Sequence, residues 1–222
     1  MVQELSIFKN KKPVIAIDGT AGSGKGELAK KLSKILGFDH LDSGILYRIF
    51  AYEFLIQGVE LKNLKSIKID FDLFLRKNYS ATNLRSEEVS KFASIIAKES
   101  FVREKLVSVQ RNFANSPPSG QGSVIDGRDI TTKITPNAEI KFYLDADINI
   151  RAKRRQMQLG LDDKDYDEIL RMMISRDNQD KNRKISPLKK TEDSLFIDTT
   201  NITEVDVLNL AIKYIKEKTD FI

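Results

Sequence analysis

Near the N-terminus, apolar residues first form a continuous run and then recur at helical spacing. Residues 13–18 are almost wholly apolar, which predicts a short buried strand with Pro13 at its edge. A glycine-rich turn follows over residues 19–24. From Lys25 onward, apolar residues recur at the spacing of one helix face, and Gly37 stands where a helix C-cap falls. The recurring residues are Leu28, Leu32, Ile35 and Leu36. The chain is therefore expected to open with a strand, a glycine turn and an amphipathic helix.

The rest of the chain alternates between the same two kinds of pattern. Further strands are predicted at residues 38–41, 123–126, 140–145 and 195–198. Helices are predicted at residues 45–57, 86–115, 147–159 and 165–180, with a last one from about residue 203. Residues 61–78 alternate loosely between apolar and polar, and residues 115–122 form a loop. Strands that alternate with helices predict an α/β fold, in which a parallel sheet lies between helices on both faces.

Composition narrows the chemistry that such a fold can carry. The 222-residue chain has no cysteine and one histidine, His40, which excludes disulfides, thiolate nucleophiles and metal sites built on several of these residues. An excess of 37 Lys and Arg over 32 Asp and Glu gives a net charge of +5, which fits nucleic acid, anionic membranes or phosphorylated small molecules. The sequence shows neither a signal-peptide pattern nor a membrane-spanning apolar run, so we expect a cytoplasmic protein without a membrane partner.

The glycine turn matches the first seven positions of a phosphate-binding loop. The matching residues are Gly19, Thr20, Ala21, Gly22, Ser23, Gly24 and Lys25. Glycines let the backbone turn its N–H groups toward phosphate oxygens, the following helix adds a favourable dipole, and Lys25 reaches the β- and γ-phosphates. A plain strand-to-helix turn is the alternative, but it would not require Lys25. The two positions after the motif are Gly26 and Glu27, where nucleoside monophosphate kinases commonly have Gly followed by Thr or Ser.

Four blocks in the same order make the sequence resemble the bacterial cytidylate kinases almost to its C-terminus. The blocks are Ile17-Asp-Gly-Thr-Ala-Gly-Ser-Gly-Lys-Gly26, Leu41-Asp-Ser-Gly44 with Tyr47-Arg48, Ile125-Asp-Gly-Arg-Asp129, and Ser175-Arg-Asp-Asn-Gln-Asp-Lys-Asn-Arg183 with Ser186-Pro-Leu188 and Ile197-Asp-Thr-Thr200. The resemblance implies one P-loop kinase domain over residues 1–222 with the three-layer fold of P-loop nucleoside triphosphate hydrolases. It also implies an inserted monophosphate-binding subdomain at about 61–112 and a lid at about 151–183. Thr20 departs from the family, which usually has proline there.

The resemblance also implies roles for individual residues. ATP would be held by residues 19–27 and by Arg154, which follows Arg151 in the lid. The monophosphate would be held by Ser43, Arg48, Ser94, Arg103, Asp129, Arg176, Asp180 and Arg183. The charges that assist transfer would come from Lys25, Arg128, Arg176 and Arg183. No residue is expected to bind metal directly, because Mg²⁺ would arrive with ATP, mostly water-bound, with Asp18 or Asp126 as outer-shell partner.

Several of these residues also have a purely structural interpretation. Arg48 lies on an otherwise apolar helix and could mark its solvent edge. Arg176, Asp180 and Arg183 share a helix face, as in a surface ladder of ion pairs. Residues 126–129 could form a tight turn, although they follow a strand where open parallel sheets bind ligands. Serine in a helix, such as Ser94, is ordinarily unremarkable, and His40 is expected to be structural. We expect the aromatic residues Tyr47, Phe50, Tyr52 and Phe54 to form core.

The resemblance therefore implies a monomeric kinase that transfers the γ-phosphoryl group of ATP to CMP and dCMP. Phosphoryl transfer needs positioning and positive charge rather than histidine or cysteine, which agrees with the composition. The alternatives are a kinase for UMP or for a small metabolite such as shikimate, a degenerate nucleotide-binding protein, and a nucleic-acid-binding module. The last would need a contiguous basic stripe, whereas the basic residues are dispersed along the predicted helices.

Glu27 gives the first testable prediction. A carboxylate in the first helical turn gains about 0.3–1 kcal/mol from the helix dipole. Near a nucleotide phosphate it is repelled by roughly 3 kcal/mol per charge pair, at about 6 Å and an effective dielectric constant of ~20. We therefore expect Glu27→Thr to lower the Michaelis constant for ATP, measured at saturating acceptor. An unchanged or higher constant would contradict this prediction.

Overall fold

The structure is a computed structural model that describes residues 12–58, 60, 63 and 79–222. Most of the loosely alternating stretch at 61–78 lies outside the described residues. Contacts within the chain divide it into two compact units, one of residues 1–42 and 110–222 and the other of residues 43–109. The first unit contains the sheet, and the second is helical. Each unit is described by itself below.

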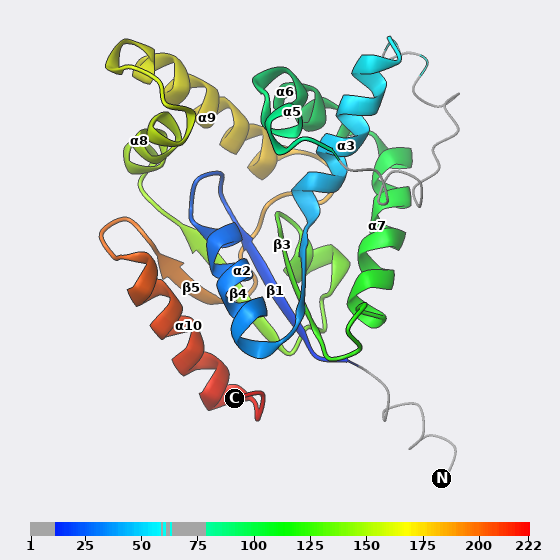
Figure 1. The fold of residues 1–222 in the computed structure, drawn as a ribbon, viewed down its shortest axis with the longest axis vertical. Coiled ribbons are helices and arrows are strands. Elements are labelled where there is room, and N and C mark those ends of the chain that lie inside the picture. The colour runs from blue at the N-terminus through cyan, green and yellow to red at the C-terminus, as the bar shows by residue number, and fades with distance from the viewer. Residues whose placement is uncertain (1–11, 59, 61–62, 64–78) are drawn as a thin grey trace. The chain divides into compact units, whose positions relative to one another are not determined.

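The sheet of the first unit is fully parallel, as the sequence predicts. Its strands are β1 (Val14–Gly19), β2 (Asp39–Asp42), β3 (Ser123–Gly127), β4 (Ile140–Asp145) and β5 (Leu195–Asp198). Their order across the sheet is β2-β3-β1-β4-β5, so β1 lies at the centre between β3 and β4 (Figure 1). Every strand therefore ends at the same edge of the sheet, and the loop after β1 lies between the loops after its two neighbours.

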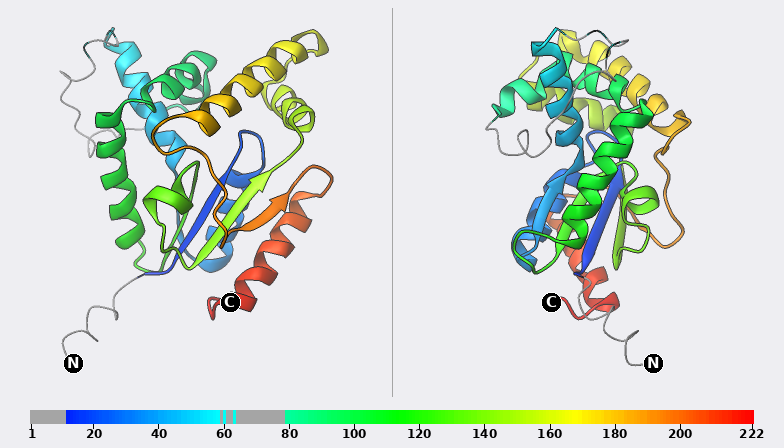
Figure 2. Two further views of the ribbon diagram at one scale, coloured as in Figure 1. Left: turned by 180° about the vertical axis from the view of Figure 1, so that it is seen from behind. Right: turned by 90° about the vertical axis from the view of Figure 1, so that its right-hand side faces the viewer.

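One face of the sheet is covered by α2 (Lys25–Leu36) and α10 (Glu204–Lys218) (Figure 2). The termini of these helices are formed by the residues that the sequence suggests. Gly37 forms a left-handed C-cap at the end of α2, and Thr203 forms a capping box at the start of α10. Between the helices and the sheet lies a core whose fully buried members include Ile15, Ile17, Leu32, Phe142 and Ala211.

The other face carries a short π-helix, η3 (Ile130–Ile134), which directly follows the turn after β3 (Figure 2). Ile130 and Ile134 are buried, and the last turns of α7 (Ser100–Asn115) are tied to η3 by Arg111. The Arg111 guanidinium donates to the carbonyl oxygens of Lys133 at 2.8 Å and Ile134 at 3.3 Å. The prediction of a parallel sheet between helical layers is therefore confirmed.

Two further helices of the first unit follow β4. Helix α8 (Ile148–Leu159) ends at Gly160, a left-handed C-cap, and a 3-10 turn leads into α9 (Tyr166–Asn182). The two helices pack against each other through Ala152, Ile169 and Met173, with Ala21 of the glycine turn against the same cluster. The segment that the resemblance assigns to a lid is thus a helical pair that contacts the glycine turn. Its movement stays a prediction.

The second unit contains α3 (Ser43–Ile56), α5 (Ala81–Arg85), α6 (Glu87–Ile96) and most of α7. This unit begins at Ser43, whereas the insertion is predicted from about residue 61, and its role as a monophosphate-binding subdomain stays a prediction. Phe50 and Phe54 are buried and stack edge to face, with ring centroids 5.8 Å apart, as expected for core. Tyr47 and Tyr52 are only half-buried.

The single helix predicted over residues 86–115 is wrong, because the chain turns at residues 97–99 and forms two helices. Ser86 does begin the first of them, since its hydroxyl accepts from the Val89 amide at 3.3 Å. The Arg103 guanidinium donates to the Ala97 carbonyl oxygen at 3.0 Å and so satisfies the end of α6. Residues 97–99 contain no glycine or proline, so the local sequence does not indicate the break. It is stabilised instead by Arg103, six residues after Ala97.

None of the described helices is both long enough and apolar enough to cross a membrane.

Gly19 gives a prediction about stability, because β1 and β4 approach closely where β1 ends. A Cβ atom at this position would lie 2.2 Å from the Leu144 carbonyl oxygen, so the backbone itself would have to move. We expect Gly19→Ala to cost about 1–3 kcal/mol of stability, as for an overpacked core. The measurement is the midpoint of urea unfolding.

Gly26→Ala is the matched control for this substitution. A Cβ atom at Gly26 meets nothing closer than an Asp126 carboxylate oxygen at 3.8 Å, and the residue lies in the first turn of α2. Alanine there should keep or raise the urea midpoint, since glycine is a poor helix former. Equal losses in both variants would show that the close approach at Gly19 does not decide the result.

Candidate active site

The glycine turn between β1 and α2 has the backbone conformation that anion binding requires. Gly22 and Gly24 adopt φ angles of 75° and 84°, in the left-handed region that favours glycine. Within the described part of the chain, the amides of residues 21–24 donate to no other backbone group. Buried polar groups are otherwise paired, so a run of available amides at a helix N-terminus is suited to phosphate oxygens.

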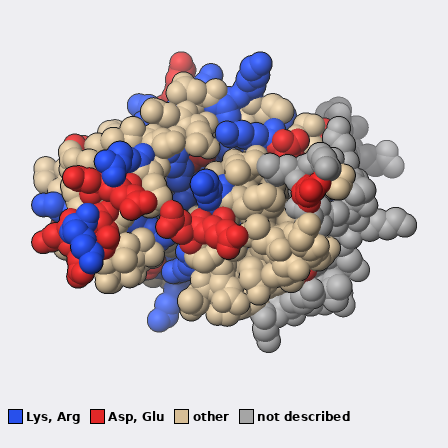
Figure 3. Space-filling model, turned by 90° about the horizontal axis from the view of Figure 1, so that it is seen from above, with Lys and Arg blue, Asp and Glu red and all other residues tan. Residues whose placement is uncertain are grey.

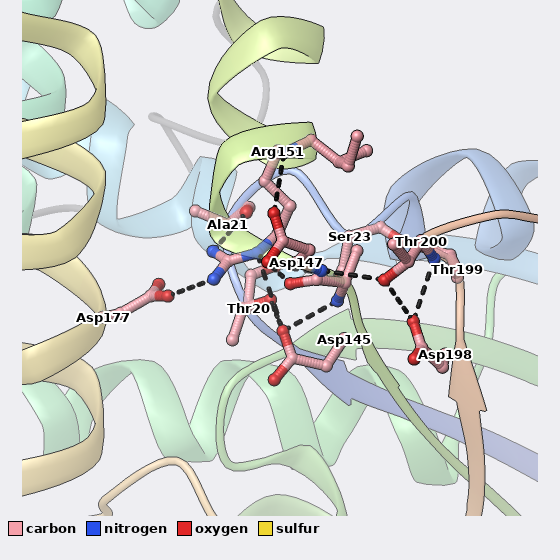
Figure 4. Close-up of polar contacts among 12 residues, drawn as sticks. Thr20, Ala21, Ser23, Asp145, Asp147, Arg151, Asp177, Asp198, Thr199 and Thr200 are labelled. Atoms are coloured by element: carbon pink, nitrogen blue, oxygen red, sulfur yellow. Dashed lines mark hydrogen bonds and ion pairs between the residues drawn. The ribbon is translucent and has the colours of Figure 1, made fainter. Parts of the chain in front are cut away.

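The carbonyl oxygens of the turn, in contrast, are held by donors. The Thr20 oxygen accepts from the Ser23 hydroxyl at 3.0 Å and from the Lys25 ammonium at 3.3 Å. The Ser23 oxygen accepts from the Thr199 hydroxyl at 3.0 Å, and the Ala21 oxygen from Arg151 at 3.1 Å (Figure 4). Because each of these oxygens has a donor, the turn keeps one fixed conformation with its amides available.

Thr20 and Arg154 also bond to the protein around the turn. The Thr20 hydroxyl donates to Asp145 at 2.6 Å and its amide to the Leu144 carbonyl oxygen at 3.3 Å. Arg154, which the resemblance assigns to ATP, donates to the hydroxyl and carbonyl oxygens of Thr199 at 3.1 and 2.6 Å. Thr20 and Thr199 thus tie the turn to the ends of β4 and β5.

Lys25, the first residue of α2, is surrounded by other charged groups. Desolvation and the nearby Arg128 guanidinium together lower the pKa of Lys25 to about 7, against the opposing effects of Asp126 and Asp42. A phosphate group would favour the charged form of the lysine. Above pH 7 the neutral amine of Lys25 is therefore expected to gain a proton when an anion binds.

Gly26, the residue after Lys25, lies beside the Asp126 carboxylate, which pairs with His40, the one histidine of the sequence. Asp126, at the end of β3, has one oxygen 2.8 Å from Nε2 of His40 on the neighbouring strand β2. Its other oxygen lies close to Gly26. His40 was expected to be structural, and its pairing with Asp126 was not predicted. Glu27 is exposed and lies 3.2 Å from Lys30, so its charge has a partner on its own helix.

Asp18 is directed away from the glycine turn, at η3. Its two carboxylate oxygens accept from the amides of Ile130 and Thr131 at 2.9 and 2.8 Å and from the Thr131 hydroxyl at 2.7 Å. Complete burial raises the pKa of Asp18 to about 6, although all three hydrogen bonds oppose that rise. Of the two carboxylates predicted beside the metal, Asp126 is therefore the one that borders the start of α2, and Asp18 fixes the loop after β3.

A second group of charges lies beside the turn after β3. Arg128 pairs with Asp180 at 2.8 Å, and Arg183 lies 3.7 Å from Asp129 and 3.8 Å from Asp180. The side chains of Arg183 and Asp180 are only 8% and 15% exposed, so the predicted charges on this helix face do not form a solvated ladder. Burial alone would raise the pKa of Asp180, but Arg128, Arg176 and Arg183 together hold it below its ordinary value.

The remaining predicted residues lie together in the helical unit. Arg48 donates to the Leu84 carbonyl oxygen at 2.9 Å and to the Ser90 hydroxyl at 2.6 Å, so it does not mark a solvent edge. Ser94 donates to the Ser90 carbonyl oxygen at 3.1 Å, and the buried Arg103 lies 5.8 Å from the Tyr47 ring centroid. Ser43, the first residue of α3, is buried. The structure thus gathers Arg48, Ser94 and Arg103 on neighbouring helices.

On the face shown in Figure 3, the described Lys and Arg side chains do not form the contiguous stripe that a nucleic-acid module would need. On the face shown in Figure 3, Lys and Arg side chains alternate with Asp and Glu side chains across the described residues. This mixture fits compact anionic ligands better than a polymer backbone.

The fold and the glycine turn define a P-loop kinase. A family model described as "Cytidylate kinase" matches residues 15–217. The chain is 40% identical to the cytidylate kinase of Vibrio cholerae, in an alignment that covers 93% of this chain and 97% of that protein. It is 39% identical to the cytidylate kinase of Thermosipho melanesiensis, in an alignment that covers 92% of this chain and 97% of that protein. The chain belongs to the cytidylate kinase family, as its four sequence blocks predict.

Solved structures support the fold alone. A crystal structure of an uncharacterized protein from Eubacterium ventriosum matches 92% of this chain and 99% of its own, at a TM-score of 0.57 and 18% sequence identity.

Lys25 gives a prediction about proton uptake. Its lowered pKa leaves a large part of the free protein with a neutral Lys25 at pH 8, and bound phosphate favours the charged form. We therefore expect ADP binding at pH 8 to take up a proton, so that the calorimetric enthalpy changes with the ionisation enthalpy of the buffer. At pH 6, where Lys25 is already charged, this dependence should vanish.

Lys25→Met is the control for the proton uptake, because it binds ADP without a titrating group at this position. A buffer dependence that is equal in the variant and in the unchanged protein would assign the proton to another residue.

Proposed function

We propose that this chain transfers the γ-phosphoryl group of ATP to CMP and dCMP, giving ADP and CDP or dCDP. The observation that carries the proposal is a preformed phosphate turn beside a cluster of partly buried arginines, in a chain of the cytidylate kinase family. The relatives are named for cytidylate, which supports CMP as the acceptor. We further propose that the protein acts as a monomer in the cytoplasm.

In this proposal the first unit supplies the positive charge that transfer requires. The amides of residues 21–24 and the ammonium of Lys25 hold the phosphates of ATP. Arg128, Arg176 and Arg183 hold the acceptor phosphate and offset the negative charge that spreads over the transferred group. Their carboxylate partners keep the cluster nearly neutral until the phosphates arrive. Of these partners, Asp180 would then turn to the sugar hydroxyls, and Asp129 to the base or sugar.

The helical unit supplies the residues for choosing the acceptor. Arg48 and Ser43 are proposed to hold the sugar–phosphate part, and Ser94 with Arg103 to meet the cytosine edge. Arg48 and Arg103 are held by groups on adjacent helices and Ser94 by a carbonyl oxygen of its own helix, which limits their conformational freedom before substrate binds. A few hydrogen bonds of this kind can discriminate strongly between bases, because a mismatched base leaves a buried polar group unpaired.

The proposal includes Mg²⁺ bound with ATP. The described residues contain no group of three or more carboxylate, histidine or cysteine side chains that could hold a metal ion. The Asp126 carboxylate, fixed by His40 beside Gly26, fits an outer-shell role in which water molecules intervene. When bound, the ion would supply charge to the ATP phosphates.

A coupled assay of ADP release tests the function. ATP and Mg²⁺ are offered with CMP, dCMP, UMP and shikimate in turn, and CMP-dependent turnover is expected. Turnover with UMP or shikimate alone would reassign the acceptor. Folded protein that binds ATP but turns over with none of them would be a degenerate nucleotide-binding protein, the alternative that Glu27 raises.

Arg176→Ala gives the prediction that tests the arginine cluster. Arg176 is charged, lies near Lys25 and Asp180, and is proposed to act on the phosphate in transfer. Its loss should lower kcat by at least 100-fold while changing ATP affinity by less than fivefold, because an interaction strongest in the transition state lowers kcat when removed. The measurement is steady-state kinetics together with direct ATP-analogue binding.

The matched control is Arg171→Ala, an exposed arginine on the same helix, which should leave kcat and ATP affinity within twofold. Normal turnover in Arg176→Ala would remove Arg176 from the mechanism.

A further inference from the structure

Arg151 joins three segments of the first unit that are far apart in the sequence. It lies in the first turn of α8, and its side chain is only 5% exposed (Figure 4). Nε donates to the Ala146 carbonyl oxygen at 2.8 Å, at the end of β4. Nη1 donates to the Ala21 carbonyl oxygen of the phosphate turn at 3.1 Å. Nη2 pairs with Asp177 on α9 at 2.6 Å. Each nitrogen of the guanidinium therefore has an acceptor from a different segment.

The contact to Ala21 bears on the conformation of the phosphate turn. Amides can converge on an anion only if the carbonyl oxygens between them are directed elsewhere. Arg151 is the donor that holds the Ala21 oxygen, near the start of the run of available amides. A Cβ atom at Gly22 would lie 3.3 Å from the Arg151 Cβ, closer than ordinary van der Waals contact, so Arg151 leaves little room for a side chain there. Arg151 therefore borders the turn closely and holds it through a hydrogen bond.

The base of α8 is itself firmly placed, which makes this support rigid. Asp147 caps the helix by accepting from the Asn149 amide at 2.8 Å, and its own amide donates to the Thr200 hydroxyl at 2.9 Å. Thr200 in turn bonds to Asp198 at the end of β5 (Figure 4). The guanidinium thus extends from a helix start that is tied to two strands of the sheet.

The contact to Asp177 connects the phosphate turn to the arginine cluster. Asp177 is buried and lies on α9 between Arg176 and Asp180. One of its carboxylate oxygens pairs with Arg151, and the other accepts no hydrogen bond from the described residues. Among the described residues, Asp177 is linked to the phosphate turn through Arg151. A change at Asp177 can therefore be used to disturb the turn without touching it.

We propose that Arg151 is a positioning residue: it holds the phosphate turn in its anion-binding conformation, and Asp177 on α9 sets its orientation. The inference rests on the proposed function only in the identity of the nucleotide. It predicts that a residue of α9 controls ADP affinity through a guanidinium that touches no nucleotide. Lysine cannot replace Arg151, because a single ammonium cannot reach acceptors on three segments in the fixed fork of a guanidinium.

Direct titration of Mg²⁺ and ADP, followed by calorimetry, tests this inference without any turnover. Arg151→Lys should weaken ADP binding about tenfold, the loss expected for a hydrogen bond from a charged donor. Asp177→Ala should weaken it about fivefold, although its side chain lies on α9. Asp177→Asn keeps an oxygen for Nη2 and should restore affinity to within twofold of the unchanged protein. Lys153→Met, at an exposed position on α8, is the matched control and should have no effect.

A double-mutant cycle separates positioning from general destabilisation. In the Arg151→Lys background, Asp177→Ala should weaken ADP binding by less than twofold further, because the two residues act through one contact. Thermal unfolding shows that each variant is folded at the temperature of the titration. Independent, multiplying effects of the two changes would overturn the inference, as would unchanged ADP affinity in folded Asp177→Ala.

The same titrations distinguish this inference from the proposed function. A chain that binds ADP, shows the expected cycle and phosphorylates no monophosphate would contradict the proposed function and support the role of Arg151. A chain that turns over CMP, but whose ADP affinity does not change in Arg151→Lys, would support the proposed function and contradict the role of Arg151. An unchanged protein that bound no ADP would overturn the role of Arg151 as well.

Discussion

The parallel pairing of β1 with both β3 and β4 is the constraint on which the rest of the structure depends. Because all three strands end at one edge, the phosphate turn after β1 lies between the polar residues that follow its neighbours. Asp126 and Arg128 come from one side, and Asp145 from the other. A sheet with one of these strands reversed would carry the same residues to opposite edges. The apolar core packed on the sheet keeps these strands in register, and so keeps their ends together at one edge.

Charge balance explains how so many ionised groups can be buried beside one another. An isolated guanidinium in a protein interior is costly, whereas one paired with a carboxylate recovers much of its lost hydration. Arg128, Arg183 and Arg151 each face an aspartate within 4 Å. A phosphate oxygen can replace a carboxylate oxygen as the hydrogen-bond partner of an arginine. In the proposed function, these aspartates would hold the arginines in place until the phosphates bind.

Local pattern was sufficient for most of the elements and for the phosphate turn. The strands β1, β3, β4 and β5 are short apolar runs, and the turn is a contiguous motif whose glycines adopt left-handed conformations. The break between α6 and α7 was missed, because a side chain rather than a glycine or proline ends the helix. The predicted roles of individual residues rest on the family blocks and stay predictions.

Contacts between distant residues could not be predicted from the sequence. Asp18 meets η3 across 112 positions, and Arg151 meets the phosphate turn across 130. Neither residue differs in its local pattern from an ordinary strand end or helix start. The one available signal was position: a polar residue at the end of a parallel strand is expected to meet others of its kind. That rule would have brought Asp42 and Asp126 to attention, since they pair in register at the ends of adjacent strands, but not His40, which lies earlier in β2.

Thr20 shows how one residue changes the origin of rigidity in the phosphate turn. A proline at this position would stiffen the turn covalently, by restricting the unfolded chain as well as the folded one. It would have neither an amide to donate to Leu144 nor a hydroxyl to donate to Asp145. With threonine, the hydrogen-bond ladder between β1 and β4 continues one step into the turn. The start of this turn is thus held by hydrogen bonds that exist only while β4 stays in place.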